Sequence, residues 1–136
     1  MNVEFGNAGQ LDTNGSGWFI GFSDWAKSEP GLLRFLPQER ELSGLCVKWK
    51  LHQQGDPNGE PKPISSGKTI SIMVGHPGSF KLEFCDSPSF LPSDSVSFTL
   101  AEVGDFVIWG EGVYHRAFGL AASCILTIRW EDLAGI

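Results

Sequence analysis

The chain has 136 residues, a formal net charge of −6, a hydrophobic content of 41% and an aromatic content of 12%. These values fit one globular domain with a buried core and exclude a largely disordered chain. An acidic chain without a basic run argues against a nucleic-acid or an anionic-membrane partner. No apolar run reaches the length of a membrane span and the first residues lack a signal-peptide pattern, so we expect a single cytoplasmic domain over residues 1–136.

Short β-like runs recur along the chain, separated by turn formers that include 17 glycines and 8 prolines. In chain order we expect strands at about 18–22, 45–53, 69–74, 80–85, 96–100, 106–109, 115–118 and 123–130. The segment 32–42 could hold a helical turn, which Pro37 interrupts, and 74–79 is typical of a hairpin turn. Many short strands with turn signals between them predict an all-β sandwich, jelly roll or barrel.

One long segment, Gln53–Lys68, interrupts this pattern because it has no apolar period. Its only acidic residues are Asp56 and Glu60. Loops of this length in a small domain are usually functional or disordered. Two interpretations stay open, a lid over a pocket and a mobile surface loop.

Polar residues follow one face of several predicted strands. The run Val47–His52 alternates strictly, so a strand places Lys48, Lys50 and His52 on one face and the apolar residues on the other. If these faces point inward, they form a positive cavity that suits carboxylates or phosphates. The candidate ligand-binding residues are Lys48, Lys50, His52, Ser71, His115 and Arg129. The alternative is that the cations lie on the solvated outer face.

The large aromatic residues and the cysteines are expected to be structural. We expect the core to be built from Trp18, Trp49, Trp109, Trp130 and Phe106. The cysteines at 46, 85 and 124 are widely spaced and form no Cys-x-x-Cys pair, which does not indicate a zinc knuckle or a dithiol site. Cys46 and Cys124 lie in apolar runs, where a free cysteine behaves as a small buried hydrophobe.

The segment Gly104–His115 combines a Gly-Asp turn, a short apolar strand, a second glycine turn and a histidine. Gly110 and Gly112 allow backbone angles that other residues avoid, and the turn would deliver His115 to the mouth of a β-architecture. The spacing of glycine, five residues, Gly-x-Gly, two residues and histidine resembles the second motif of the cupin family. Gly44, five residues and Lys50-Leu51-His52 resemble the first motif, with lysine in the place of the first histidine.

This resemblance is strongest over residues 44–130, and it implies a double-stranded β-helix, the jelly-roll barrel of the cupins, with a pocket between two sheets. It also implies a homodimer and a divalent metal (iron, manganese, zinc or nickel) held by His52 and His115. Lysine has no lone pair at neutral pH, so Lys50 cannot act as a ligand. Asp56 is the expected third ligand, with Glu60 or His76 as alternatives, although His76 also fits an exposed turn position.

Three functions stay open at this stage. The first is a cupin-like protein that binds an anionic or polyhydroxylated small molecule. The second is a metal-dependent enzyme of the dioxygenase or isomerase type that uses His52 and His115. The third is a structural or regulatory protein that dimerises and offers an apolar face to a partner. The sequence has no nucleophile elbow, phosphate loop or dinucleotide fingerprint, which excludes serine hydrolases, kinases and Rossmann enzymes.

Overall fold

Strands make up nearly all of the regular structure in the computed structural model, which describes residues 1–21, 28–29, 31, 33–35, 42–75 and 78–132. The elements are β1 Val3–Asn7, η1 Ala8–Gln10, β2 Trp18–Ile20, β3 Leu33–Phe35, β4 Leu42–His52, β5 Lys68–Gly75, β6 Ser79–Cys85, β7 Ser95–Leu100, β8 Asp105–Trp109, β9 Tyr114–Ala121 and β10 Ser123–Asp132. Among the described residues, no helix is long and apolar enough to cross a membrane.

The strands predicted from the sequence are confirmed, with ends that differ by a few residues. Two further strands, β1 and β3, were not predicted; β1 pairs with β8, and β3 pairs with β2. The helical turn suggested for 32–42 is wrong at 33–35, which is β3, and at 42, where β4 begins; residues 32 and 36–41 fall outside the described residues. The hairpin turn expected at 74–79 also includes undescribed residues, among them His76.

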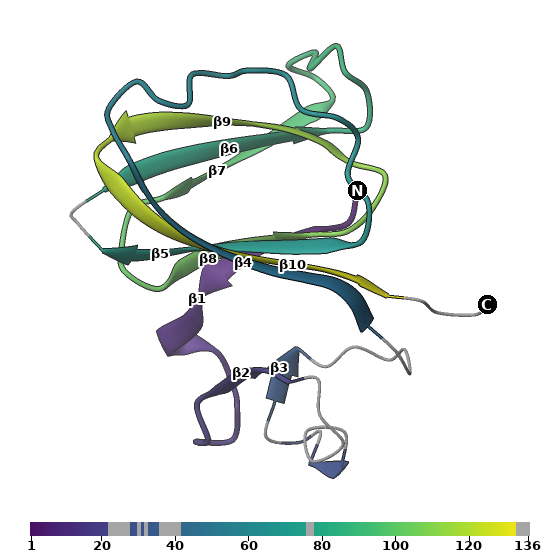
Figure 1. The fold of residues 1–136 in the computed structure, drawn as a ribbon, viewed down its shortest axis with the longest axis vertical. Helices are drawn as coiled ribbons and strands as arrows, with labels where there is room; N and C mark the ends of the chain where they lie inside the picture. The colour runs from purple at the N-terminus through teal and green to yellow at the C-terminus, as the bar shows by residue number, and fades with distance from the viewer. Residues whose placement is uncertain (22–27, 30, 32, 36–41, 76–77, 133–136) are drawn as a thin grey trace.

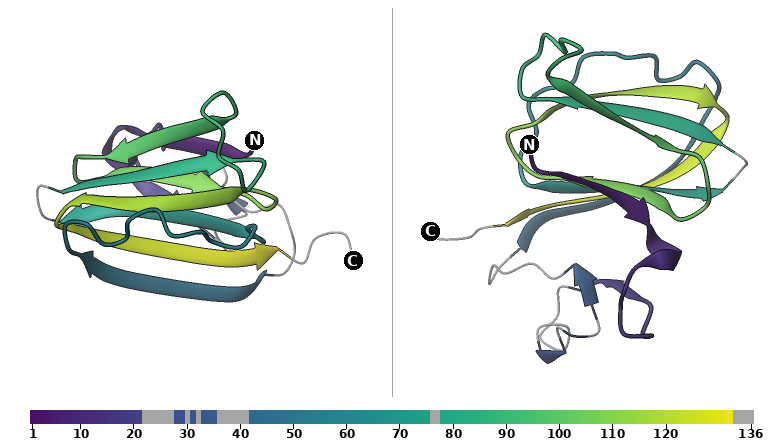
Figure 2. Two further views of the ribbon diagram at one scale, coloured as in Figure 1. Left: turned by 90° about the horizontal axis from the view of Figure 1, so that it is seen from above. Right: turned by 180° about the vertical axis from the view of Figure 1, so that it is seen from behind.

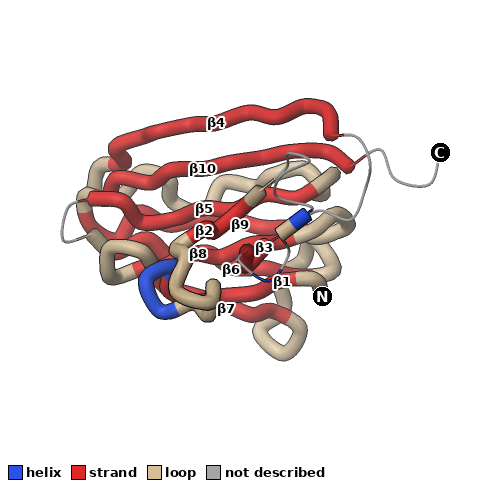
Figure 3. Tube along the Cα trace, turned by 90° about the horizontal axis from the view of Figure 1, so that it is seen from below, coloured by secondary structure: helices blue, strands red, loops and turns tan. Residues whose placement is uncertain are grey.

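Two antiparallel sheets face each other and form the predicted all-β jelly roll (Figure 1). One sheet has the strand order β1-β8-β5-β10-β4, and the other has the order β7-β6-β9. Figures 2 and 3 show β4 at one edge of the larger sheet, beside β10. The small parallel pair of β2 and β3 lies outside the barrel, against the outer face of the larger sheet (Figure 1).

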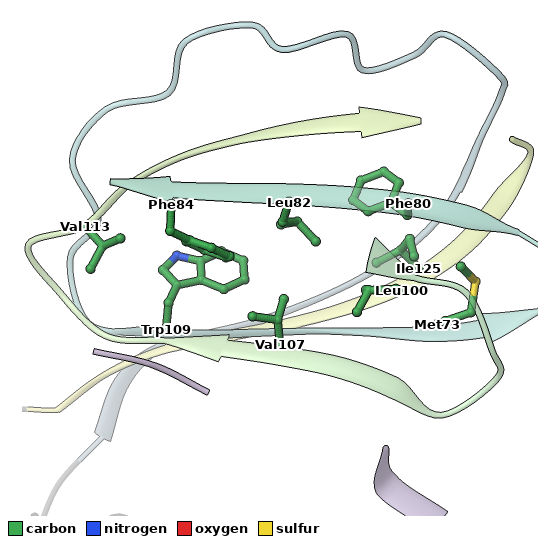
Figure 4. Close-up of a cluster of buried hydrophobic side chains, with 9 residues drawn as sticks. All are labelled: Met73, Phe80, Leu82, Phe84, Leu100, Val107, Trp109, Val113 and Ile125. Atoms are coloured by element: carbon green, nitrogen blue, oxygen red, sulfur yellow. The ribbon is translucent and has the colours of Figure 1, made fainter. Parts of the chain in front are cut away.

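The main core lies between the two sheets, where inward residues from successive strands interdigitate (Figure 4). Its members are Met73, Phe80, Leu82, Phe84, Leu100, Val107, Trp109, Val113 and Ile125. A second cluster on the outer face of the larger sheet contains Phe106 and Trp130 and is covered by residues of β2 and β3. The core positions predicted for Trp109, Trp130 and Phe106 are therefore confirmed.

The core positions predicted for Trp18 and Trp49 are wrong, since these side chains are 51% and 67% exposed. Trp49 belongs to the outer face of the edge strand β4, and its neighbours on that face are exposed as well. We call this face the apolar stripe; its residues are Leu45, Val47, Trp49 and Leu51. A strand pattern identifies an apolar face, but it does not show whether another element covers that face.

The long segment between β4 and β5, residues 53–67, is called the strap here. It runs across the top of the barrel in Figure 1, beside β9. Backbone hydrogen bonds join it to β9 and the preceding turn: Gly55 N to Gly119 O (2.7 Å), Gly119 N to Pro57 O (2.8 Å), Gly59 N to Ala117 O (2.8 Å) and Ser65 N to Val113 O (2.9 Å). The strap therefore extends the smaller sheet as an irregular edge, joined at both ends.

The close approach of the strap to β9 depends on a glycine. A Cβ atom added at Gly119 would lie 2.6 Å from the carbonyl oxygen of Asp56 and 2.9 Å from that of Gln53. Both neighbours are backbone atoms, so the strap would have to move. We expect Gly119→Ala to lower the free energy of unfolding by about 1–3 kcal/mol, as overpacking usually does, which thermal or urea denaturation would measure.

Gly75→Ala is the matched control, because Gly75 also lies in a strand and an added Cβ would meet only Cys124 Cβ at 3.6 Å. The control should unfold close to the wild type. Equal stability of Gly119→Ala and the wild type would contradict a tightly fitted strap.

Candidate functional site

A cavity of about 730 Å³ lies between the larger sheet, β6, β9 and the strap. All six ligand-binding residues predicted from the sequence line this one cavity, and so does Asp56. The strap contributes a continuous wall from Lys62 to Ser66 together with Asp56, Pro57 and Glu60. The strap therefore lies against a pocket, as the first of the two interpretations of this segment requires.

Lys48 and Lys50 face the pocket because side chains alternate along β4 and because β4 pairs with β10. Lys48 is in register with Thr127, and Lys50 is in register with Ile125, so the inward residues of both strands form rows across the pocket. The same alternation puts Cys46 on the pocket face, where it is exposed. The expectation that Cys46 is a buried hydrophobe is therefore wrong, whereas Cys124 is buried as expected.

Hydroxyl groups form part of the pocket wall beside Lys48. Ser71 of β5 is in register with Thr127 of β10, and their hydroxyl oxygens lie 3.0 Å apart, within hydrogen-bond distance. Ser71 is 4% exposed. These hydroxyls can also donate to or accept from an uncharged polar group in the cavity.

Arg129 connects the larger sheet to the strap. Its Nη2 donates a hydrogen bond to Ser66 Oγ (2.9 Å), and Ser66 Oγ donates to Glu131 Oε1 (3.2 Å). Ser65 Oγ donates to the Gly110 carbonyl (2.7 Å) and accepts from the Val113 N–H (2.9 Å). Two neighbouring serines thus fix the end of the strap beside the cation.

Lys62 is a pocket cation that sequence reasoning did not single out. It lies between Pro61 and Pro63, and proline restricts both its own φ and the backbone of the residue before it. The Pro-Lys-Pro run could have indicated that the backbone at Lys62 is restricted. The neighbouring sequence does not show, however, that the strap lies against a pocket.

Among the described residues, the four cations that line the pocket form no direct ion pair, although Arg129 is linked to Glu131 through Ser66. Within the described ranges, no salt bridge involves Lys48, Lys50, Lys62 or Arg129. Burial, followed by the charges of Lys50 and Lys62, lowers the pKa of Lys48 below its usual value. Burial and the two neighbouring cations therefore both disfavour the charged form of Lys48.

His115 follows the predicted turn, in which Gly112 has a φ of 78°. Gly110 was expected to need an unusual backbone angle and does not; instead, an added Cβ there would collide with the Asn2 side chain. The His115 ring lies 5.0 Å from the Trp109 ring, centroid to centroid. Burial, then the charges of Lys62, Arg129 and Lys48, lower the pKa of His115 to about 4, so it is neutral at pH 7.

His52 lies at the C-terminal end of β4 and is 8% exposed. Its ring is 4.8 Å from that of Phe80, centroid to centroid. Burial and the charges of Lys50 and Lys48 lower the pKa of His52, while Asp56 raises it by a smaller amount. His52 is therefore also neutral at pH 7.

Several buried polar atoms of the pocket walls have no hydrogen-bond partner among the described residues. They are Nδ1 of His52, Nδ1 of His115 and Nε1 of Trp109. Buried polar atoms in folded proteins nearly always have a partner, which can be a bound water or a ligand.

The residues expected to hold a metal do not fit one. The ring of His52 lies 4.8 Å from that of Phe80, and the ring of His115 lies 6.4 Å from that of Phe84, centroid to centroid. Phe80 and Phe84 are separated by four residues of β6, which corresponds to about 13 Å along a strand, whereas ligands of one ion must all lie about 2 Å from it. Among the described residues, no three His, Cys, Asp or Glu side chains form a group that could hold a metal, so His52, Asp56 and His115 are not assembled for one.

Comparison with known proteins shows the fold. No protein-family model and no curated protein matches the sequence. The 2-hydroxyethylphosphonate dioxygenase of Streptomyces albus, solved with its substrate and Fe(II), is 13% identical and superposes with a TM-score of 0.51 over 66% of this chain and 19% of that one.

Two sugar 3,4-ketoisomerases also superpose. The TDP-quinovose enzyme of Campylobacter jejuni is 15% identical (TM-score 0.46, 65% of this chain and 62% of that one). The enzyme of Thermoanaerobacterium thermosaccharolyticum, solved with TDP, is 14% identical (TM-score 0.46, 68% and 61%). The chain spans about a fifth of the dioxygenase and less than two thirds of either isomerase. The strand arrangement and the dioxygenase similarity together define an all-β, cupin-like jelly roll.

The lowered pKa of His115 makes stability depend on pH. Between pH 4 and 6.5 the unfolded state binds a proton at His115 that the folded state does not, so stability should be full above pH 6.5 and fall as the pH drops to 4. The loss should reach about 3 kcal/mol at most, from 1.36 kcal/mol per pKa unit. Urea denaturation at a series of pH values would measure it.

His115→Gln removes the titrating group and keeps a polar side chain, so most of this slope should disappear. Ser71→Ala is the control, because it changes the same pocket without removing a titrating group, and it should keep the wild-type slope. A wild-type slope in His115→Gln would show that His115 is not held neutral by its surroundings.

Proposed function

We propose that this protein binds a small anionic molecule in the cavity between its two sheets. The observation that carries the proposal is the convergence of Lys48, Lys50, Lys62 and Arg129 on one cavity of an acidic chain, with no salt bridge to any of them among the described residues. Lysine and arginine bind carboxylates and phosphates through charge-assisted hydrogen bonds.

The electrostatics of the pocket residues support the same proposal. After burial, the charges of Lys50 and Lys62 lower the pKa of Lys48, and those of Lys62, Arg129 and Lys48 lower the pKa of His115. An anion placed among them would reverse the sign of that interaction and stabilise the charged forms. Binding energy at such a site therefore comes partly from relief of repulsion that exists before the ligand arrives.

The uncharged groups of the pocket favour a ligand that also carries hydroxyl or carbonyl groups. The Ser71 and Thr127 hydroxyls, which lie 3.0 Å apart, both line the cavity and can make further hydrogen bonds. A metal-dependent enzyme, the alternative from sequence, would require His52 and His115 to share an ion, and they lie at opposite ends of the pocket. Anion binding is therefore the function that these residues favour.

Anions should raise the melting temperature of the protein. A ligand at a hundred times its dissociation constant stabilises the folded state by about 2.7 kcal/mol, which for a domain of this size corresponds to roughly 5–10 °C. We expect such a shift with inorganic phosphate in differential scanning fluorimetry at constant ionic strength. The shift should be equal with and without a chelator.

Lys48→Gln and Arg129→Gln should each reduce the anion-dependent shift several-fold. Lys81→Gln is the control, because Lys81 lies near Glu83 (3.9 Å) on the smaller sheet and does not line the cavity. A shift that is the same in all three variants would locate anion binding elsewhere. A shift that disappears with a chelator would favour the metal-dependent alternative.

The homodimer is proposed on a separate observation, the exposed apolar stripe of β4. Its four side chains are 45–67% exposed and together present on the order of 400 Å² of apolar surface, the size of patches that are often functional. A stable interface buries about 800 Å² per partner, so the stripe would supply about half of one partner's share. We propose that a second copy packs face to face on this stripe, since lysines on an edge strand disfavour edge-to-edge pairing.

Sedimentation velocity would test the dimer. The wild type should sediment as a dimer at micromolar concentration, and Trp49→Ser should shift it toward the monomer. Val103→Ser is the control, because Val103 is similarly exposed (65%) but lies outside the stripe. A monomeric wild type would contradict the proposed dimer and leave the pocket unaffected.

A further inference from the structure

Ile64, in the strap, is a large apolar side chain that lines the cavity and is nevertheless 51% exposed. The other exposed large apolar side chains of the described residues lie outside the cavity. An exposed apolar residue on an open surface is ordinary and has no meaning by itself. Ile64 differs in its position, because it lies on a cavity wall two residues after the cation Lys62.

The chain next to Ile64 is held in place by Ser65, which makes four hydrogen bonds. The Ser65 N–H donates to the Val113 carbonyl (2.9 Å), and the Ser65 carbonyl accepts from the Gly112 N–H (2.9 Å). Its Oγ donates to the Gly110 carbonyl (2.7 Å) and accepts from the Val113 N–H (2.9 Å). The strap therefore presents Ile64 from a backbone that is fixed beside the turn between β8 and β9.

Buried apolar side chains form the inner wall of the same cavity. Phe80 and Leu82 of β6 and Ile125 of β10 line it, and all three point into the space between the sheets (Figure 4). Ala117 of β9 also lines the cavity, is partly buried and packs against the main core. We call Phe80, Leu82, Ala117 and Ile125 the inner wall.

The cations of the cavity, in contrast, are exposed residues. They are Lys48, Lys50, Lys62 and Arg129. The cavity thus combines charged groups that reach solvent with an apolar inner wall that does not. A ligand that is charged over its whole length would place part of that charge against apolar side chains, which cannot replace the hydrogen bonds it makes to water.

We propose that the ligand is an organic acid with an apolar body, such as an alkyl or aryl carboxylate. Its acidic group binds to the exposed cations, and its apolar body lies against Ile64 and the inner wall, where burial of apolar surface stabilises the complex. Ile64 is the specificity-determining residue, since a hydroxylated chain would lose water at this side chain without gaining a hydrogen bond. This inference rests on the proposed anion-binding function and specifies its ligand.

Two six-carbon monoacids separate an apolar body from a hydroxylated one: hexanoate has an alkyl chain, and gluconate has hydroxyl groups along its chain. We expect calorimetry at pH 7.5 and constant ionic strength to show hexanoate binding at least tenfold more tightly than gluconate. Affinity should also rise at least threefold from acetate to butyrate and again from butyrate to hexanoate, because each buried methylene adds stability. Gluconate binding as tightly as hexanoate, or an affinity independent of chain length, would overturn the inference.

Ile64→Ser tests the residue, and its exposure means that the fold does not depend on it. The hexanoate affinity of this variant should fall at least threefold, whereas its affinity for inorganic phosphate, which has no apolar part, should stay at the wild-type value. Leu91→Ser is the control, because Leu91 is similarly exposed (54%) and lies outside the cavity. Equal hexanoate affinity in Ile64→Ser and the wild type would overturn the role of Ile64.

Phosphate separates this inference from the function on which it rests. If phosphate binds and hexanoate is no tighter than gluconate, only this inference fails. If neither phosphate nor any carboxylate binds, the proposed function fails with it. Hexanoate that binds equally well to Lys48→Gln, Arg129→Gln and the wild type would be held by its chain alone, which would contradict both.

Discussion

The alternation of side chains along β4 is the constraint on which the rest of the molecule depends. Among the described strands β4 is an edge strand that pairs with β10, so this one register sets which residues face the cavity and which face outward. The inward set carries Lys48, Lys50 and His52, and the outward set is the apolar stripe. A pocket for a charged ligand and a face for a partner are thus two sides of a single strand.

The strap completes the pocket that β4 begins. It starts at the end of β4, follows β9 through hydrogen bonds with Gly119 and Ala117, and returns to β5 beside Arg129. The absence of a side chain at Gly119 allows the backbone of the strap to lie within contact distance of β9. Irregular chain can hold Lys62 at the cavity because its backbone groups are paired at both ends, and this makes the loop part of the binding surface.

Local patterns in the sequence predicted most of the strands and six pocket residues, because alternation and turn glycines act over a few positions. They also identified His115, since the turn before it is encoded by neighbours such as Gly112. They could not predict the 67% exposure of Trp49, because a strand pattern does not show whether another element covers its apolar face. The local patterns also could not place Lys62 in the pocket, because its position depends on the path of the strap. Nor could they show that His52 and His115 are far apart, because that distance depends on how the strands are arranged.

The edge position of β4 also limits how the pocket can change during evolution. Insertion or deletion of one residue in the middle of a strand reverses the facing of every residue beyond it. In β4 such a change would turn the Trp49 face into the cavity and the lysines toward the outside. New ligand preferences are therefore accessible through substitutions in β4 and through changes in the length of the strap. The number of residues in β4 itself cannot change by one without altering both the cavity face and the apolar stripe.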